Sequence, residues 1–292
     1  NVLAASIQST EKNEAPSDRL YNMTKSCILQ ALNDAQLTEK NKKNILIVGT
    51  SFGARLDDDQ EASKKLHEWV DKLADELGLT PIVLSTACSS ASDAILMGLA
   101  LIRSGYADTC ICGGADILGE TKRLAHSALG TMSPTTIRTF DQARDGTILG
   151  EGAGFIVLEK HQPHDNKKKY ALLMGAGSAN DASGLAAPEK EGVGIKLAVA
   201  RSLKDANLQP QDIQIINAHG TGTPTNDSTE VKAYEDIFAD VNPIVFATKG
   251  AFGHSLGATG ALEAIATILA LYHNNVPPIK NLNQPVNSSF LR

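Results

Sequence analysis

Three residues stand out for the chemistry that their side chains could perform together: Cys88, His219 and His254. Each follows a short apolar run typical of a buried strand, and each precedes glycines, hydroxyl side chains and a helical pattern. Residues at such strand ends project into the solvent-filled space beyond the sheet, so we expect all three to meet in one cleft. A thiol nucleophile beside two imidazoles indicates a reaction centre for the carbon chemistry of thioesters.

Cys88 lies at the predicted beginning of a helix over residues 89–104. The unpaired N–H groups and partial positive charge of a helix start favour the thiolate, so we expect a pKa below the usual ~8.5 of a free thiol. The alternative is that a lone cysteine before an apolar helix is only a small buried hydrophobe. The two histidines favour the nucleophile over this alternative.

The two histidines stand in glycine-rich turns. His219 is flanked by Gly220 and by Thr221 and Thr223, whose hydroxyls and exposed backbone can bond the amides of a ligand. His254 stands at the predicted start of a helix over residues 254–272, where the helix dipole disfavours an imidazolium. Two neutral imidazoles that donate to one oxygen would stabilise an enolate formed when a carboxylate leaves as carbon dioxide.

The composition bounds the class of protein. With 292 residues, the chain can form two modest domains or one large α/β unit. A net charge of −6 and an aromatic content of 4% argue against a nucleic-acid binder. Four scattered cysteines indicate neither a disulfide framework nor a zinc site, and no apolar run approaches the roughly 18 residues of a membrane span. We therefore expect a protein of the reducing cytoplasm.

Helical and strand periodicity alternate along the chain, which predicts a mainly parallel sheet. Between residues 116 and 150 the periodicity fades, and we expect a long functional loop there. The predicted helices span 17–37, 58–77, 89–104, 191–206, 226–238 and 254–272, and the predicted strands 44–49, 81–86, 109–113, 154–159, 171–178, 213–217 and 244–247.

The second part of the chain repeats the order of elements of the first. A polar segment at residues 161–169 is the expected boundary, which divides a half at residues 1–160 that carries Cys88 from a half at residues 161–292 that carries both histidines. The helices that follow Cys88 and His254 are apolar on nearly every side. Such helices are expected in the middle of a layered protein.

Five short motifs resemble those of the β-ketoacyl synthases, the condensing enzymes of the thiolase superfamily. They follow the family's order, and the resemblance covers residues 45 to about 283. The resemblance implies a thiolase-like five-layer αβαβα fold, of the α/β class, built from two related halves. The motifs are Thr86-Ala87-Cys88-Ser89-Ser90, Phe140-Asp141 with Arg144-Asp145-Gly146, Gly150-Glu151-Gly152, His219-Gly220-Thr221-Gly222-Thr223 with Asp227 and Glu230, and Lys249 with Gly253-His254-Ser255.

The resemblance also implies a role for each reactive residue. Cys88 would accept the acyl group from a thioester, and its own N–H would form half of an oxyanion hole. His219 and His254 would bind a malonyl extender, assist its decarboxylation and hold the enolate. Lys249 would support the two histidines.

Further residues match the family's binding and supporting positions. Thr221 and Thr223 would bond the pantetheine arm, and Glu230 with Asp227 would form a buried polar network. His126 falls in the loop where elongation synthases usually place a Gly-Phe pair that faces the acyl pocket. We therefore expect His126 to contact substrate.

The implied activity is that of a 3-oxoacyl-[acyl carrier protein] synthase in fatty-acid or polyketide-type biosynthesis. A histidine at position 254, where starter-type synthases usually carry asparagine, indicates the decarboxylating elongation class. No metal or cofactor is implied, because the phosphopantetheine arrives on the acyl carrier protein. The family forms homodimers or pseudo-symmetric heterodimers, and an acidic carrier could dock on Lys122 and Arg123 or on the lysines at 167–169.

Two alternatives remain open at this point. The chain could be a non-catalytic, synthase-like partner subunit that shapes another chain's pocket, although its cysteine argues against this role. Thiolase-type coenzyme A chemistry needs a second, distal cysteine, and no cysteine follows His254.

Two family segments find no counterpart in the sequence. One is the strand that normally opens the fold, and the other is the closing pair of strands with a Gly-Phe-Gly-Gly motif, whose backbone supplies the second oxyanion donor. We therefore expect the chain to be part of a longer protein.

Overall fold

The computed structural model describes residues 14–37, 41–58, 63–162, 167–184, 186–238 and 240–286. The larger of its two sheets has the strand order β2-β1-β3-β4. Strands β1 (Ile45–Gly49), β2 (Thr80–Leu84) and β3 (Thr109–Asp116) are parallel, and β4 (Gly152–Glu159) runs antiparallel to β3.

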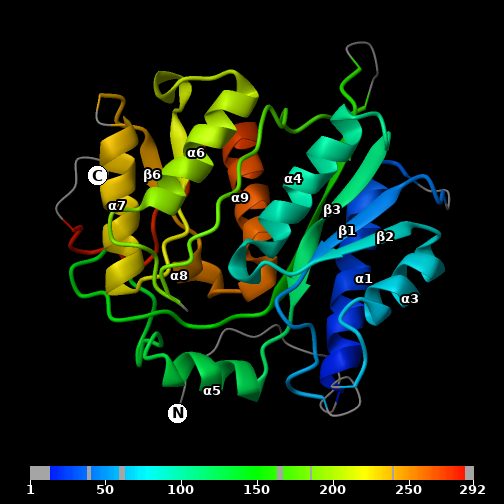
Figure 1. Cartoon of the computed structure of the whole chain (residues 1–292), viewed down its shortest axis with the longest axis horizontal. Coiled ribbons are helices and arrows are strands. Elements are labelled where there is room, and N and C mark those ends of the chain that lie inside the picture. The colour runs from blue at the N-terminus through cyan, green and yellow to red at the C-terminus, as the bar shows by residue number, and fades with distance from the viewer. Residues whose placement is uncertain are drawn as a thin grey trace.

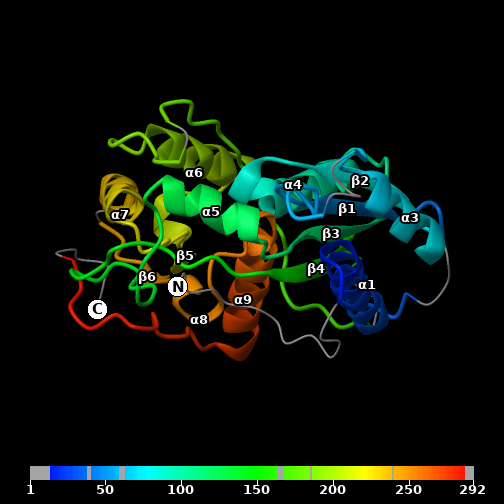
Figure 2. The same ribbon diagram turned by 90° about the horizontal axis from the view of Figure 1, so that it is seen from below.

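Helices cover both faces of this sheet (Figures 1 and 2). Helices α1 (Pro16–Asp34) and α3 (Glu68–Leu77) pack on one face, and α4 (Ser90–Arg103) and α9 (Thr259–His273) pack on the other. Strand β1 is buried along its whole length because it contributes alternate side chains to the two apolar clusters on either side. This explains why its sequence is continuously apolar.

The second sheet lies beyond α9 and consists of the parallel strands β5 (Ile215–Asn217) and β6 (Ile244–Phe246). Helices α6 (Val193–Ala206) and α7 (Pro224–Phe238) cover its outer side, and their apolar residues share one cluster with β6. The layers are thus α1/α3, sheet, α4/α9, sheet and α6/α7. The predicted five-layer αβαβα fold is confirmed.

Three elements differ from the predicted pattern. The helix predicted from residue 58 begins only at Glu68, after residues 63–67 that form turns. The long predicted loop contains a helix, α5 (Glu120–Ala128), which had no apolar stripe to reveal it because its one buried residue is Lys122. The strand predicted at 171–178 is wrong, because the backbone of these residues pairs with neither of the two described sheets.

Helix α9 is the central helix of the layered structure (Figure 1). With the short 3₁₀ turn before it, it forms an 18-residue segment, Leu256–His273, that is long and apolar enough to cross a membrane by length and hydropathy alone. This helix packs against α4 and β4, so its composition fits the interior position that the sequence predicted.

Candidate active site

Three turns bring Cys88, His219 and His254 together. Cys88 lies in the short 3₁₀ turn η1 (Ala87–Ser89) between β2 and α4, and His219 follows β5. His254 lies between α8 (Lys249–Phe252) and the turn η3 (Leu256–Ala258), and not in a first helical turn as predicted. The cysteine sulfur and one nitrogen of each imidazole all lie within 4.8 Å of one another.

Close backbone packing places the turn of Cys88 against the turn of His254. A side chain at Gly49 would lie 2.3 Å from the carbonyl carbon of Ser90, and one at Gly260 would lie 2.8 Å from the backbone nitrogen of Ser92. Only glycine allows these approaches, which set α4 on the end of β1 and α9 beside α4.

Both turns contain a residue with left-handed backbone that is not glycine. Ala87, directly before Cys88, has φ 54°, and Leu256, two residues after His254, has φ 49°. Such conformations cost roughly 1–3 kcal/mol and persist only where the surroundings hold them, commonly at functional sites. Their positions mark the two turns as strained.

Burial raises the pKa of the Cys88 thiol to about 11. The positive charge of Lys249 acts in the opposite direction but does not outweigh the loss of solvent around a thiolate. The lowered pKa predicted from the helix start is therefore wrong. Without substrate, Cys88 is a neutral thiol at neutral pH.

Both histidines are neutral at neutral pH. Burial, together with the nearby charge of Lys249, holds the pKa of His219 and of His254 well below the usual range of an imidazole. The predicted neutral state is confirmed, but its main cause is desolvation, since His254 does not lie in a helical first turn.

Hydrogen bonds define which nitrogen of each imidazole carries the proton. The N–H of Leu256 donates to Nδ1 of His254 (3.2 Å), and the ammonium of Lys249 lies 3.1 Å from Nδ1 of His219. An ammonium and a backbone N–H can only donate, so Nδ1 is the acceptor in both rings, and the Thr259 hydroxyl, 3.0 Å from Nδ1 of His254, can donate to the same nitrogen. Each neutral ring therefore carries its proton on Nε2 and can donate it to a ligand.

A thiol and two imidazoles at this spacing could also ligate zinc. A histidine that binds a metal through one nitrogen usually donates the N–H of the other to an acceptor. Here the Nδ1 atoms of His219 and His254 both face donors. Binding zinc through Nε2 would place the proton on Nδ1, and these hydrogen bonds would then be lost. The group fits a pair of hydrogen-bond donors better than a zinc site.

Lys249 is buried and joins the turn of His219 to helix α9. Its ammonium contacts the carbonyl oxygen of His219 and the carboxylate of Glu263 on α9. Burial raises the pKa of Glu263, against the influence of Lys249. Glu263 was not predicted from the sequence, although it is the only charged residue of an otherwise apolar helix, which could have revealed it.

Two acids in the first half of α7 hold the turn that carries His219. Glu230 accepts the N–H groups of His219 and Gly220, both at 2.7 Å. Asp227 accepts the N–H of Gly222 (3.1 Å) and that of Phe140, and burial raises its pKa to about 6. The structure thus places both acids in the buried polar network expected of them.

The three predicted substrate-binding residues differ in how far they are buried. Thr221 is buried and Thr223 half-buried, and their hydroxyls lie 2.8 Å apart. His126, on α5, is half-buried, with Nδ1 3.4 Å from the hydroxyl of Thr131. His126 lies near enough to His254 for its charge to contribute to the low pKa of that residue.

The predicted docking role is wrong for Lys122, and docking at Arg123 stays a prediction. Lys122 is only 2% exposed, and its ammonium is bonded to the carboxylate of Asp116, so it cannot meet a carrier protein. At the other patch, Lys168 lies over the rings of Tyr170 and Tyr272. Docking at the lysines of residues 167–169 stays a prediction.

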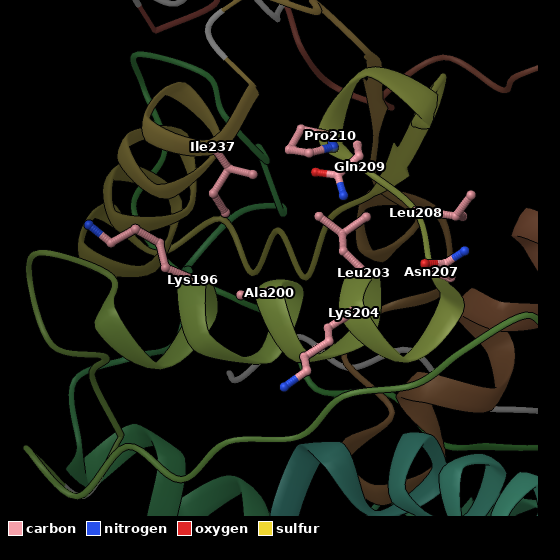
Figure 3. A pocket seen from close by; sticks show the side chains of 9 residues that line it. All are labelled: Lys196, Ala200, Leu203, Lys204, Asn207, Leu208, Gln209, Pro210 and Ile237. Atoms are coloured by element: carbon pink, nitrogen blue, oxygen red, sulfur yellow. The ribbon is translucent and has the colours of Figure 1, made fainter.

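A separate surface groove of about 400 Å³ lies between α6, α7 and the residues that follow α6 (Figure 3). Leu203 and Pro210 form apolar walls, and Lys196 at one end pairs with Asp236. The residues that line it do not include Cys88 or either histidine, so it is not part of the reaction centre.

Known proteins resemble the chain over nearly all of its length. The family model "Beta-ketoacyl synthase, N-terminal domain" matches residues 4–164, and "Beta-ketoacyl synthase, C-terminal domain" matches residues 170–283. The 3-oxoacyl-[acyl-carrier-protein] synthase 2 of Synechocystis sp. is 32% identical over 92% of this chain and 72% of its own length. The mitochondrial 3-oxoacyl-[acyl-carrier-protein] synthase of Arabidopsis thaliana is 37% identical over 68% of this chain and 46% of its own length.

Solved structures agree with the sequence relatives. The ishigamide ketosynthase/chain length factor superposes with a TM-score of 0.87 at 30% identity, covering 99% of this chain and 79% of its own. The layered sheets and the three converging turns define a thiolase-like condensing protein. The chain belongs to the β-ketoacyl synthase family.

Proposed function

We propose that the protein is a 3-oxoacyl-[acyl carrier protein] synthase of fatty-acid or polyketide-type biosynthesis. It would condense an acyl group held on Cys88 with malonyl-carrier protein. The observation that carries the proposal is the meeting of this thiol with two neutral imidazoles whose Nδ1 atoms both accept hydrogen bonds. The family supports the general class of condensing transferase.

The first half-reaction is acyl transfer. The sulfur of Cys88 forms a bond to the thioester carbonyl carbon, the pantetheine sulfur leaves, and the proton of the thiol passes to that leaving group. Because the resting thiol is neutral, removal of this proton is part of the barrier. The backbone N–H of Cys88 would stabilise the oxyanion.

The second half-reaction is decarboxylative condensation. The bond between the malonyl carboxylate and its α-carbon breaks, carbon dioxide leaves, and the electron pair forms an enolate. The Nε2–H groups of His219 and His254 would donate to the enolate oxygen. The α-carbon then attacks the acyl carbonyl, and Cys88 leaves as the thiolate.

The remaining residues would position these groups. Lys249 and Glu263 would hold His219 in its Nε2–H form. Thr221 and Thr223 would bond the pantetheine amides, and His126 would line the acyl pocket. No metal or cofactor of the protein's own takes part, and the phosphopantetheine comes with the carrier.

The partners follow from the family. We expect a cytoplasmic protein that receives substrates from acyl carrier protein and forms a homodimer or a pseudo-symmetric heterodimer. A second candidate function is a non-catalytic partner subunit, because the name of the solved relative at 30% identity includes a chain length factor. The presence of Cys88 favours the catalytic role.

Labelling separates these two functions. We expect the full-length protein, incubated with an isotopically labelled acyl-carrier thioester, to carry the label on Cys88 by mass spectrometry. Cys88→Gln should abolish labelling and still release carbon dioxide from malonyl-carrier protein, because the histidines remain. His254→Ala should keep the label and lose about 10²- to 10³-fold in decarboxylation, as for other lost oxyanion donors.

Cys27→Ser is the matched control, since Cys27 is a partly buried free thiol that bonds the carbonyl of Ala153. It should label and decarboxylate like the wild type. A protein that neither labels nor turns over alone, but raises the activity of a second synthase chain, would establish the partner role instead.

A further inference from the structure

A buried ion pair lies beside the reaction centre, and neither of its residues has a part in the proposed reaction. It joins Asp116, at the end of β3, to Lys122 on α5; neither side chain is more than 2% exposed. The three N–H bonds of the ammonium go to Asp116 Oδ1 (2.7 Å) and to the carbonyl oxygens of Gly53 (2.8 Å) and Ile117 (2.9 Å). Lys122 is thus fully bonded.

The second oxygen of Asp116 joins two separate parts of the chain. Oδ2 accepts the N–H of Ser51, after β1, and the N–H of Gly257, in the turn that follows His254. A side chain at Gly257 would lie 2.5 Å from the Ser51 nitrogen and 2.7 Å from the carboxylate. The bare backbone of Gly257 is therefore required for this carboxylate to reach it.

The bond to Gly257 acts next to Leu256, one of the two described residues that hydrogen-bond to Nδ1 of His254; the other is Thr259, through its hydroxyl (3.0 Å). Leu256 has left-handed backbone (φ 49°), and its own N–H donates to Nδ1 of His254. The peptide on the other side of Leu256 supplies the N–H that Asp116 accepts. Leu256 is consequently fixed on both sides, by the imidazole and by the carboxylate.

We propose that Asp116 and Lys122 form a positioning pair that holds the Leu256 backbone so that His254 keeps its proton on Nε2. A carboxylate binds N–H groups more strongly than a neutral acceptor does, and this strength offsets the strain of the left-handed residue. Lys122 balances the buried charge of the carboxylate. The proposal rests on the proposed function only for its effect on rate, because the proton's position on His254 is independent of any reaction.

The test compares three variants of the full-length protein. Asp116→Ala removes the acceptor, whereas Asp116→Asn combined with Lys122→Met keeps an acceptor oxygen and removes both charges. Lys196→Met is the control, since it removes a lysine from the exposed pair with Asp236. Thermal unfolding shows which variants remain folded.

The first measurement is the nitrogen chemical shift of ¹⁵N-labelled histidine, which reports the protonated nitrogen of His254. We expect Nε2–H in the wild type, in the control and in the double variant, and a mixture of the two tautomers in Asp116→Ala. The second is malonyl decarboxylation, which should fall up to about 100-fold in Asp116→Ala and less than about tenfold in the double variant. Acylation of Cys88 should change less than decarboxylation.

An unchanged His254 tautomer in a folded Asp116→Ala protein would overturn the proposal. Equal losses of acylation and decarboxylation, explained by a lower melting temperature alone, would overturn it as well. If Asp116→Ala does not fold, the double variant decides instead, and decarboxylation at the wild-type rate in a folded double variant overturns the proposal. A wild type that shows the tautomer but does not decarboxylate malonyl thioester contradicts the proposed function and leaves this positioning role supported.

Discussion

Cys88 is held in its neutral form by the loss of solvent around its sulfur, although the residue as a whole is only half-buried. With a pKa of about 11, only about one molecule in 10⁴ carries the thiolate at pH 7. In the proposed reaction, acyl transfer to Cys88 would therefore include loss of the thiol proton as the pantetheine sulfur leaves.

Alkylation of Cys88 by iodoacetamide should rise about tenfold for each pH unit between pH 7 and 10, because the thiolate is the reacting species. Peptide mass spectrometry measures the modified fraction over time. Lys249→Met should slow the reaction further, since Lys249 lowers the pKa of this thiol. Lys196→Met should not, and a plateau already at pH 8 would show that the thiol is not buried in this way.

At the scale of single residues, the sequence predicts functional residues whose neighbours in the chain are themselves informative. Cys88, His219, His254 and Lys249 each stand beside glycines or hydroxyls where strands end. The pair of Asp116 with Lys122 could not be predicted in the same way. Its contact to Gly257 spans 141 positions, and a lysine beside an arginine is typical of the surface.

Elements differ in how strongly their sequences define them. Helices α4 and α9 are apolar on most sides and were predicted within a few residues, because their positions between two sheets demand that composition. Helix α5 buries only Lys122, so no periodic apolar pattern exists to predict it. Residues 171–178 have the composition of a strand, but a strand also needs a neighbour, and composition does not encode one.

At Gly260 the backbone of α9 leaves no room for a side chain beside Ser92 of α4, so Gly260→Ala tests whether this close approach sets the site. The new methyl group would meet the backbone nitrogen of Ser92 at 2.8 Å and move the first turn of α9 away from α4. We expect a loss of roughly 1–3 kcal/mol in the free energy of unfolding and a larger proportional loss of condensation. Denaturant unfolding and product formation measure the two effects.

Gly194→Ala is the matched control, since it adds a methyl group to α6, where the nearest atom lies at 3.3 Å. It should leave condensation unchanged. Wild-type activity in Gly260→Ala would mean that the two helices do not need this approach to align the turns of Cys88 and His254.

On the scale of the whole molecule, Asp141 ties the long central loop to the last described residues. Its Oδ2 accepts the N–H groups of Asn283 and Gln284, both at 2.7 Å, and Val286 donates to the carbonyl of Phe140 (2.8 Å). These bonds from the backbone, aided by the charge of Arg138, hold the pKa of Asp141 below its usual value although burial acts against them.

A carboxyl whose pKa is lower in the folded than in the unfolded state stabilises the fold above the unfolded pKa. This contribution is lost as the pH falls through the folded value. The difference in unfolding free energy between wild type and Asp141→Asn should thus be largest near pH 7 and narrow below about pH 4. Urea denaturation at several pH values measures it, and a gap that does not vary with pH would contradict the role of the charge.

Because the site is divided between the two sheets, the rate of the proposed reaction should depend on how the sheets are positioned relative to each other. Cys88 is carried by a turn of the first sheet and His219 by a turn of the second, and α9 lies between them. A shift of about 1 Å between reacting groups can cost about 100-fold in rate without breaking any strand or helix. If the protein has the proposed activity, mild denaturant should therefore abolish condensation while the circular dichroism still looks native, and regained turnover is the stricter criterion for correct refolding.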